Sequence, residues 1–441
     1  MKYIRLENFR CYSEQAITFK SGINLLVGDN ATGKTSMLKA CKYVLSAFFA
    51  GFSDDNTKWL NPNDSDFREE FADDILLQEK PIHITFDTKD TMETLYQTSF
   101  VEEEGYMNVL TKNSKKNSRS LIAGIKEYKS YATRLSQYYI STEGQQYALP
   151  LFAYFSTEDI HVPRKINRNK FKAYSHKPSF GYYECLEGDG FFDYWIYRLL
   201  VLQEGRESSP EITIVRKAIQ KALGTDGCNI VQDIQIRPIQ KKVYFIFTDG
   251  REVEADYLSD GYKRLINIVM DIAFRCAFLN RGIYGEETCQ RTKGTVVIDE
   301  VDLHLHPTMQ AVVLNSLRSA FPNLQFIVSS HAPMVMSGVE SNEENVVYKL
   351  GYSNENYTVE EIVTFGMDLS TISKRVLNVP PRDVKVAADL KELFALIDNE
   401  ENESARALLQ KLRAKYKREL PDFVEAEAML NFSIFADETD N

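Results

Sequence analysis

The sequence predicts an α/β fold with a largely parallel central sheet, on the basis of three observations. An apolar run at residues 23–27 ends at a glycine, and from Thr35 onward apolar residues recur at helical spacing. A strand at 295–298, a helix at 306–321 and a strand at 325–329 follow one another as parallel strands with a crossover helix do. No sustained heptad repeat separates these two halves, so no long coiled-coil arm is expected.

Further elements are expected around this core. Strands are expected at residues 2–6, 16–19 and 82–86, with a hairpin partner for the last at 106–109, at 149–155, and in a hairpin at 243–247 and 252–255. Helices are expected at 191–202, 210–223, 260–279 and from 383 onward. The first three strands predict an antiparallel N-terminal region, and the final stretch predicts a helical extension.

The composition is that of an ordinary globular protein. The 441 residues are 44% hydrophobic and 26% charged, and the net charge of −11 argues against a surface covered with nucleic-acid contacts. It leaves room for a local basic groove. The charged N-terminus and the short apolar runs predict a cytoplasmic protein without a membrane association. Six scattered cysteines without a Cys-x-x-Cys pair predict small reduced core residues rather than disulfides or a zinc site.

Residues 28–35 read Gly-Asp-Asn-Ala-Thr-Gly-Lys-Thr and match the phosphate-binding loop pattern G-x-x-x-x-G-K-[ST]. The match follows an expected strand and opens an expected helix, which is the context that this loop requires. Backbone N–H groups at such a helix N-terminus point toward an anion, and glycines allow the close approach of the backbone. Lys34 is then expected to contact the β- and γ-phosphates of a nucleotide, and the Thr35 hydroxyl to ligate Mg²⁺.

Asp299 and Glu300 follow the apolar strand candidate at residues 295–298. Alone, this pair is explained equally well by an ordinary strand end. In a chain that also carries a phosphate-binding loop, the pair predicts a catalytic site. Asp299 is expected to hold Mg²⁺ through water, and Glu300 to orient or deprotonate the attacking water.

The segment Leu-Ser-Asp-Gly at residues 258–261 opens the helix expected at 260–279. Ser259 and Asp260 are good N-cap residues, so a local capping role is expected in any case. Because a helix N-terminus also attracts phosphate, the Ser259 hydroxyl and the Gly261 N–H are expected to face a γ-phosphate.

Three histidines lie close to these motifs. His331 follows the strand at 325–329, in Ser-Ser-His-Ala-Pro, where it could be a structural residue or a sensor of the γ-phosphate. Because His331 follows three other motifs of a nucleotide site in the same chain, we favour a sensor of the γ-phosphate. His304 and His306 alternate in a short segment that suggests either a metal pair or a loop at a subunit interface, and their spacing favours the loop.

Four motifs have now been described: the phosphate-binding loop, the Leu-Ser-Asp-Gly segment, the Asp299–Glu300 pair and the segment with His331. They occur in the order found in ABC-type ATPases, and the chain resembles the RecF/SMC group of that class. Asn-Phe-Arg at residues 8–10 is similar to the N-terminal segment of the group, which implies that Arg10 lies near the phosphates. The resemblance implies an ABC ATPase head that uses ATP and Mg²⁺. In such heads the segment containing Ser259 cannot reach the phosphate loop of its own chain. It therefore implies a head-to-tail homodimer with two nucleotides between the subunits, or a higher oligomer of such dimers.

The site expected on these grounds has three groups of residues. The expected catalytic residues are Lys34, Glu300 and His331. The residues expected to bind the nucleotide are Arg10, Gly28, Asn30, Ala31, Thr32, Gly33, Lys34, Thr35, Ser36, Ser259 and Gly261. The expected Mg²⁺ ligands are Thr35 and Asp299.

A closer resemblance is carried by residues 258–261, 299–307 and 330–333, which look like the bacterial ATPases described as ATP-binding proteins involved in virulence. Residues 383–432 are similar to the tail of PtuA-type ATPases, which include the ATPases of Septu and of certain retron anti-phage systems. This resemblance implies a regulatory or sensor ATPase that controls an HNH-nuclease partner, PtuB. It does not locate the Q-loop glutamine of the family, for which the candidates are Gln137, Gln145 and Gln146.

Four parts of the chain are expected. They are the N-terminal part of the ATPase head (1–155), a helical and basic insertion lobe (156–245), the C-terminal part of the head (246–370) and a helical extension (371–441).

Several alternatives stay open at this point. The basic stretch 164–174 is either a solvated loop or a contact for DNA or RNA. The apolar positions in 383–432 serve either internal packing or the docking of a nuclease or of further dimers. A RecF-like DNA-repair ATPase is the alternative function. A self-contained nuclease is disfavoured, because about 75 residues after the last core strand are too few for a nuclease domain.

Overall fold

The structure is a computed structural model. It describes residues 1–69, 71–72, 75–76, 80–88, 107–115, 122–141, 144–157, 177–188, 191–203, 209–354, 356–379 and 382–439. The chain divides into two compact units, Met1–Ile372 and Ser373–Asn441.

A six-stranded sheet forms the centre of the first unit, in the order β10-β14-β15-β3-β16-β17. Its strands are β3 (Ile23–Val27), β10 (Leu151–Phe155), β14 (Gly294–Ile298), β15 (Leu324–Ser329), β16 (Val346–Ser353) and β17 (Asn356–Ile362). Neighbours from β10 to β16 run parallel, and β17 pairs antiparallel with β16. Every residue of β3, β10 and β15 is buried, as in parallel sheets covered on both faces. The predicted mixed α/β fold is confirmed.

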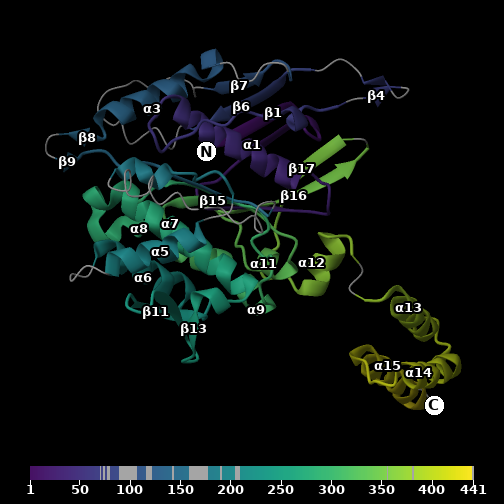
Figure 1. Ribbon diagram of the computed structural model, residues 1–441. Coiled ribbons are helices and arrows are strands. Elements are labelled where there is room, and N and C mark those ends of the chain that lie inside the picture. Colours follow the sequence, from purple (N-terminus) through teal and green to yellow (C-terminus); the bar gives the residue numbers. More distant parts are fainter. Residues whose placement is uncertain are drawn as a thin grey trace. The chain divides into compact units, whose positions relative to one another are not determined.

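A second, antiparallel sheet has the order β2-β1-β6-β7. Its strands are β1 (Tyr3–Phe9), β2 (Tyr12–Thr18), β6 (Ile82–Asp87) and β7 (Asn108–Lys112), the last being the predicted hairpin partner of β6. Helix α1 (Lys34–Ala47) contacts β1 and β6 on one side and β14 and β15 on the other, so it lies between the two sheets (Figure 1). The helix that follows the phosphate-loop motif is thereby held from both sides.

A helical region covers the other face of the central sheet. Its elements are α5 (Phe192–Gln203), α6 (Pro210–Leu223), α7 (Asp260–Tyr284) and the sheet β11 (Val231–Arg237), β12 (Lys242–Phe247) and β13 (Glu252–Glu254). Helix α7 packs against α5, α6 and β10. Within it, the buried Asp271 accepts hydrogen bonds from Arg275 Nε at 2.6 Å and from Trp195 Nε1 at 2.8 Å. This buried carboxylate is therefore paired, as a charge in a core must be.

One helix was predicted wrongly, and one hairpin was not predicted. The single helix predicted over 306–321 is two helices, α9 (Pro307–Gln310) and α10 (Val313–Ala320), because the backbone opens to φ −117° at Val312. Strands β16 and β17 were not predicted. Their β-branched and aromatic residues flank a polar turn, a pattern that is typical of a hairpin.

Shorter elements complete the first unit. They are α3 (Lys126–Tyr138), α8 (Thr288–Arg291), α11 (Pro333–Ser337), α12 (Leu369–Arg375), β4 (Phe71–Ala72), β5 (Ile75–Leu76), β8 (Ile140–Ser141) and β9 (Gly144–Gln145). Helix α12 continues past the boundary between the units. The six cysteines are free thiols, five of them buried, as predicted. None of the helices in the described part of the chain combines the length and the apolar character that crossing a bilayer requires.

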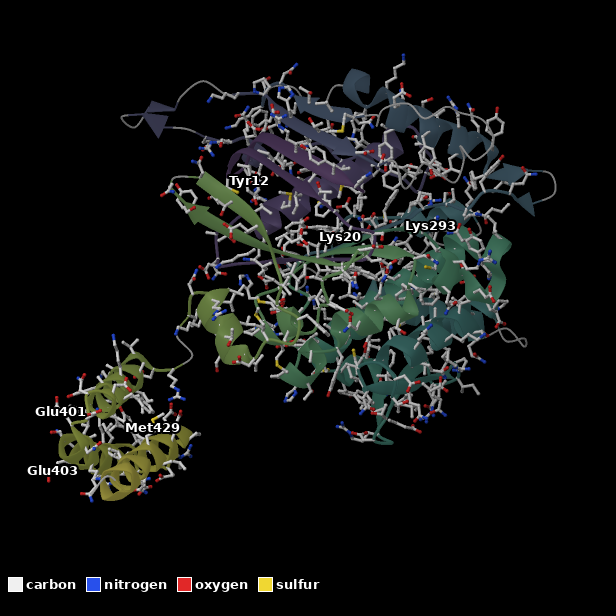
Figure 2. All side chains as sticks on the ribbon, turned by 180° about the vertical axis from the view of Figure 1, so that it is seen from behind. Tyr12, Lys20, Lys293, Glu401, Glu403 and Met429 are labelled. Carbon is white, nitrogen blue, oxygen red and sulfur yellow. The ribbon has the colours of Figure 1, made fainter. Side chains whose placement is uncertain are left out.

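The second unit contains three helices, α13 (Val384–Asp398), α14 (Asn402–Tyr416) and α15 (Pro421–Thr439). They share a core formed by Leu390, Leu393, Ala405, Leu409, Leu412, Phe423, Ala426 and Leu430, with Phe394, Leu396, Ile397 and Leu408 packed against it. Charged side chains such as Glu401 and Glu403 lie on the surface (Figure 2). The apolar positions noted in the sequence therefore pack against one another within this unit.

Candidate functional site

Residues 28–33 turn from the end of β3 into the first turn of α1. Gly28 and Gly33 have φ angles of 141° and 95°, which residues with a side chain rarely adopt. A Cβ at Gly28 would lie 2.2 Å from the carbonyl oxygen of Leu350, and one at Gly33 would lie 2.3 Å from the Tyr12 hydroxyl. The glycines thus permit the loop that brings the N-terminus of α1 to the wall of a pocket.

Lys34 lies across this loop, and its side chain is nearly buried. Its Nζ donates hydrogen bonds to the carbonyl oxygens of Gly28 at 2.9 Å and Asp29 at 2.7 Å. Burial lowers the pKa of Lys34 to about 8, although the carboxylates of Asp299 and Glu300 act in the opposite direction. The ammonium group is therefore held in the pocket by neutral carbonyls and can gain an anionic partner there.

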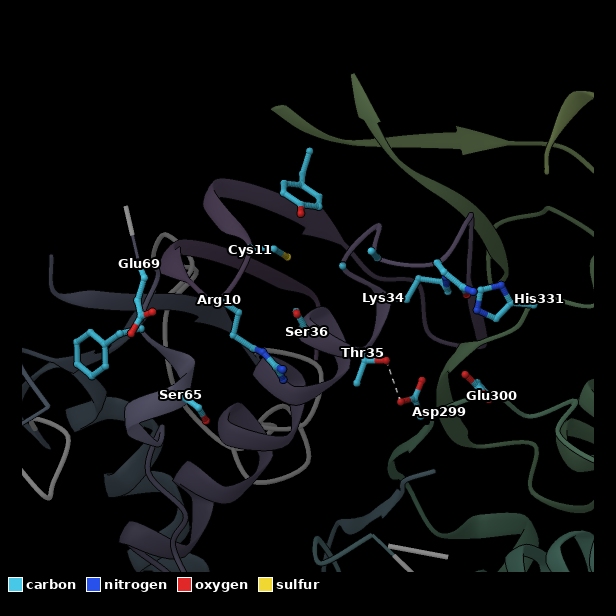
Figure 3. Close-up of a pocket in the computed structure, with 15 residues that line it drawn as sticks. Arg10, Cys11, Lys34, Thr35, Ser36, Ser65, Glu69, Asp299, Glu300 and His331 are labelled. Atoms are coloured by element: carbon cyan, nitrogen blue, oxygen red, sulfur yellow. Dashed lines mark hydrogen bonds between the residues drawn. The ribbon is translucent and has the colours of Figure 1, made fainter. Parts of the chain in front are cut away.

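Asp299 connects the ends of three elements. Its Oδ2 accepts a hydrogen bond from Thr35 Oγ1 at 3.1 Å, at the start of α1 (Figure 3). Its Oδ1 accepts one from Ser329 Oγ at 2.6 Å, at the end of β15. The Asp299 carboxylate is buried, and a carboxylate beside a hydroxyl offers only oxygen ligands, which suit Mg²⁺. Parallel pairing of β14 with β15 brings Asp299 and Ser329 together.

No group of three or more His, Cys, Asp and Glu side chains in the described residues could form a metal cage by itself. His306 instead caps α9, where its Nδ1 accepts a hydrogen bond from the backbone N–H of Thr308 at 3.4 Å. A site with few protein ligands is what Mg²⁺ uses when phosphates supply the remaining oxygens.

Glu300 and His331 lie at the same end of the pocket as Asp299 (Figure 3). Glu300 has a φ of 49°, an uncommon left-handed backbone, and its N–H donates to Ser329 Oγ at 2.8 Å. Burial and the Lys34 charge lower the pKa of His331, so its imidazole is neutral at pH 7. A neutral imidazole can donate one hydrogen bond and accept another.

Arg10 lies on the far side of Ser36 from Thr35 and Asp299 in Figure 3, with Ser65 and Glu69 beyond it. Its Nε is 4.0 Å from Oδ1 of the buried Asp66, which also accepts hydrogen bonds from Tyr43 Oη at 2.6 Å and from the Asn63 N–H at 2.7 Å. Arg10 Nη1 is buried without a hydrogen-bond partner. The Arg10 guanidinium thus faces Asp66 through Nε and has an unpaired donor at Nη1.

The pocket has a volume of about 660 Å³, which is within the range of small-molecule sites. Of the predicted residues, those that line it are Arg10, Asn30, Ala31, Gly33, Lys34, Thr35, Ser36, Asp299, Glu300 and His331. Gly28 and Thr32 support the loop instead: Gly28 accepts from Lys34, and Thr32 Oγ1 donates to the Asp29 carbonyl oxygen at 2.8 Å.

Five lining residues were not predicted: Cys11, Ser65, Phe67, Glu69 and Tyr357. Tyr357 comes from the hairpin β16–β17, and its ring packs edge-on against that of Tyr12, which Figure 2 labels. Residues 65–69 belong to a polar segment that follows α1. No motif marks these positions, because their contribution depends on where tertiary packing places them.

Ser259 and Gly261 are outside this pocket. Ser259 is the exposed N-cap of α7, and Gly261 packs so closely on the next loop that a Cβ would lie 2.2 Å from the His304 carbonyl oxygen. The chain by itself therefore does not bring Ser259 to the residues around Lys34.

The other candidates from the sequence are the Q-loop glutamines and the basic stretch. Gln145 Nε2 donates to the carbonyl oxygen of Leu279 at 2.6 Å, and neither Gln145 nor Gln137 nor Gln146 lines the pocket. The basic stretch 164–174 lies outside the described residues.

Comparison with known proteins identifies the family. Residues 3–254, more than half of the chain, match the model of a family described as the AAA domain. The chain belongs to this AAA domain family.

Curated relatives extend over most of the chain. It is 26% identical over 405 residues to a Retron Vc95 probable ATPase from Vibrio cholerae serotype O1 biovar El Tor, which covers 80% of this chain and 74% of that protein. It is 23% identical over 388 residues to a Septu protein PtuA from Bacillus thuringiensis, with 84% of each chain covered. The similarity to retron and Septu ATPases that the motifs predicted is confirmed.

A third relative matches a much shorter segment. The DNA replication and repair protein RecF of Clostridium kluyveri (strain ATCC 8527 / DSM 555 / NBRC 12016 / NCIMB 10680 / K1) is 51% identical over 43 residues, which are 10% of this chain and 12% of that protein.

Proposed function

We propose that this protein binds ATP with Mg²⁺ and hydrolyses it between two copies of the chain that associate head to tail. The observation that carries the proposal is a single pocket in which Lys34 and Thr35 of the phosphate loop meet Asp299, Glu300 and His331. Three segments distant in sequence supply these side chains. Together they offer a cation for phosphate, oxygen ligands for Mg²⁺ and a carboxylate for the attacking water, which are the groups that a phosphoryl transfer needs. Membership of the AAA domain family supports the same conclusion.

Each side chain has a role in this proposal that follows from its position. Lys34 balances the charge of the β- and γ-phosphates, and Arg10 donates to phosphate oxygens through its unused Nη1. Glu300 accepts a proton from, or orients, the attacking water, and His331 hydrogen-bonds the γ-phosphate. Mg²⁺ held by Thr35 and Asp299 supplies further charge neutralisation on the phosphates.

The second copy is needed because Ser259 is exposed and outside the pocket of its own chain. The N-terminus of a long helix such as α7 favours an anion, and Ser259 places a hydroxyl there. In a head-to-tail dimer, Ser259 and the Gly261 N–H of one subunit close over the γ-phosphate bound by the other. Two nucleotides then hold the dimer together, and hydrolysis releases it.

Replacing Lys34 by alanine tests the binding site. Lys34→Ala is expected to weaken ATP binding by at least about 100-fold, because a charge-assisted contact to phosphate is lost in a poorly solvated site. Isothermal titration with ATP and Mg²⁺ measures ATP binding, and a phosphate-release assay measures hydrolysis. Lys39→Ala, on the same helix but outside the pocket, is the matched control. Unchanged ATP affinity in Lys34→Ala would contradict the assignment of the loop.

The pH dependence of ATP binding gives a second test. Because burial lowers the pKa of Lys34 to about 8, the ammonium loses its proton as the pH rises through 8 in the nucleotide-free protein. Phosphate oxygens favour the charged form, so binding above pH 8 takes up a proton. The dissociation constant is therefore expected to increase roughly 20-fold between pH 7.5 and 9.5. Lys34→Met should remove this dependence, whereas a flat profile in the unaltered protein would argue against a role for the Lys34 charge.

For the cellular role, we propose a regulatory or sensor ATPase of an anti-phage system that controls an HNH nuclease. The supporting observation is that the retron and Septu relatives match along most of the chain, whereas the RecF match covers about a tenth of it. A RecF-like DNA-repair ATPase that binds DNA is the second candidate, supported by that short match.

Affinity purification of the full chain from its native host separates the two roles. Recovery of an HNH nuclease with the chain, and loss of phage resistance in Lys34→Ala cells, are expected for the defence role. Recovery of DNA-repair proteins, with phage resistance unaffected and DNA-damage sensitivity increased, would support the second candidate.

A further inference from the structure

Arg264 lies in the second turn of α7, five residues after Ser259, and reaches the turn that carries Glu300. Its Nη2 donates hydrogen bonds to the carbonyl oxygen of Asp299 at 2.5 Å and to that of Glu300 at 3.1 Å. Glu300 is the residue with the left-handed backbone, φ 49°. Such a conformation in a residue with a long side chain persists only where its surroundings hold it. Glu300 is thus held on two sides: Arg264 donates to its carbonyl oxygen, and Ser329 Oγ accepts from its N–H.

The first turn of α7 also contacts the other end of this loop. Gly261 packs directly on His304, whose φ of 61° is again left-handed. Residues 299–304 are therefore held at both ends by the start of α7: by the Arg264 side chain at the first residue and by the Gly261 backbone at the last. The helix end that offers Ser259 and the loop that carries Glu300 form one packed body.

Charged atoms at this contact have unmet hydrogen-bonding capacity. Arg264 Nε and Nη1 are buried without a hydrogen-bond partner, and so is Asp302 Oδ1 on the facing loop. Burial lowers the pKa of Arg264, while the nearby carboxylates of Glu300, Asp299 and Asp302 oppose this effect. A guanidinium remains charged in any protein environment. Both residues are half-buried, but these three atoms are buried and lack a hydrogen-bond partner, which costs free energy until they are paired.

We propose that Arg264 is a positioning residue that holds Glu300 in place for hydrolysis, and that the remaining donors of Arg264 pair with Asp302 when nucleotide is bound. This inference rests on the proposed ATPase function. The donors left over from the carbonyl contacts, Nε and Nη1, take Asp302 as their acceptor, so that one guanidinium secures both the backbone of Glu300 and the loop after it. Helix α7 presents Ser259 to the nucleotide of the partner subunit. In this proposal the same helix also positions the Glu300 carboxylate at the nucleotide of its own subunit.

A double-mutant cycle in the full-length protein tests this pairing. Arg264→Gln and Asp302→Asn are each expected to slow single-turnover ATP hydrolysis by about 100-fold, as expected for a catalytic group misplaced by about 1 Å. ATP affinity, measured by titration, should not change, because neither residue lines the pocket. The double variant should be no slower than the slower single variant, because each change removes the same pair. Arg264→Lys should recover part of the rate, since an ammonium can still donate to a carbonyl.

Lys263→Gln is the matched control, because it removes a charge from the same turn of α7. Lys263 lies over the Phe192 ring and near Asp193, away from Glu300, so its hydrolysis rate should equal that of the unaltered protein. Thermal unfolding of each variant identifies loss of folding. If Arg264→Gln unfolds, the cycle is run with Arg264→Lys and Asp302→Asn.

Three results separate the possibilities. Hydrolysis at the unaltered rate in Arg264→Gln overturns the positioning role while the ATPase proposal stands. Losses that multiply in the double variant overturn the pairing with Asp302. Absence of hydrolysis in the unaltered protein, with ATP bound, overturns the proposed function together with this inference.

Discussion

Glu300→Gln is expected to bind ATP as tightly as the unaltered protein and to hydrolyse it about 10²–10⁴-fold more slowly, the range associated with losing a general base. The amide has the shape of the carboxylate and keeps the N–H contact to Ser329. It loses the negative charge that orients and deprotonates water. Because hydrolysis releases the dimer in our proposal, the variant should accumulate as an ATP-bound dimer.

Light scattering coupled to size-exclusion chromatography, with ATP and Mg²⁺ in the buffer, measures the dimer, and phosphate release measures the rate. Glu344→Gln is a suitable control, because Glu344 forms an ion pair with Arg318 on the surface, outside the pocket. Hydrolysis by Glu300→Gln at the unaltered rate would show that Glu300 is not the catalytic carboxylate.

Ser259→Arg is expected to abolish hydrolysis while each subunit still binds ATP. Ser259 is exposed and outside the pocket of its own chain, so the substitution leaves the contacts of Lys34 intact. A long side chain at the N-terminus of α7 prevents that helix end from approaching the γ-phosphate of the neighbouring subunit. Ile239→Arg, at a position 99% exposed between β11 and β12, controls for an added surface arginine.

Mixing two inactive variants tests whether the site is shared. Ser259→Arg keeps a working phosphate loop, and Lys34→Ala keeps a working α7 N-terminus. In an equal mixture half of the dimers pair one of each, and each such dimer has one intact site, so about a quarter of the unaltered activity should return. Failure of the mixture to hydrolyse ATP would be incompatible with sharing across subunits.

The phosphate loop could be identified from sequence because its physical requirements are local. Gly28 and Gly33 need their special backbone angles within one turn, and Lys34 follows directly on the same segment. The same applies to Asp299 and Glu300, which an apolar strand presents at its end. Such motifs can be recognised in a sequence because consecutive residues meet the structural requirement.

The other walls of the pocket could not be predicted in this way. Tyr357 arrives on the unpredicted hairpin β16–β17, and Phe67 and Glu69 come from a polar segment that has no motif. Asp66, which anchors Arg10, looks in the sequence like one acidic residue among many. Each of these positions depends on which distant segments pack together.

The fold class, the family resemblance, the phosphate loop and the adjacent carboxylate pair can be predicted from consecutive residues. In contrast, the support of Asp299 by Ser329, the support of Glu300 by Arg264 and the position of Ser259 outside its own pocket follow only from the folded chain. The difference lies in the range of the interactions. Backbone geometry and hydrophobic period act between near neighbours in the chain, whereas a hydrogen bond that joins residues 35 or 36 positions apart exists only after the sheet and its helices have packed.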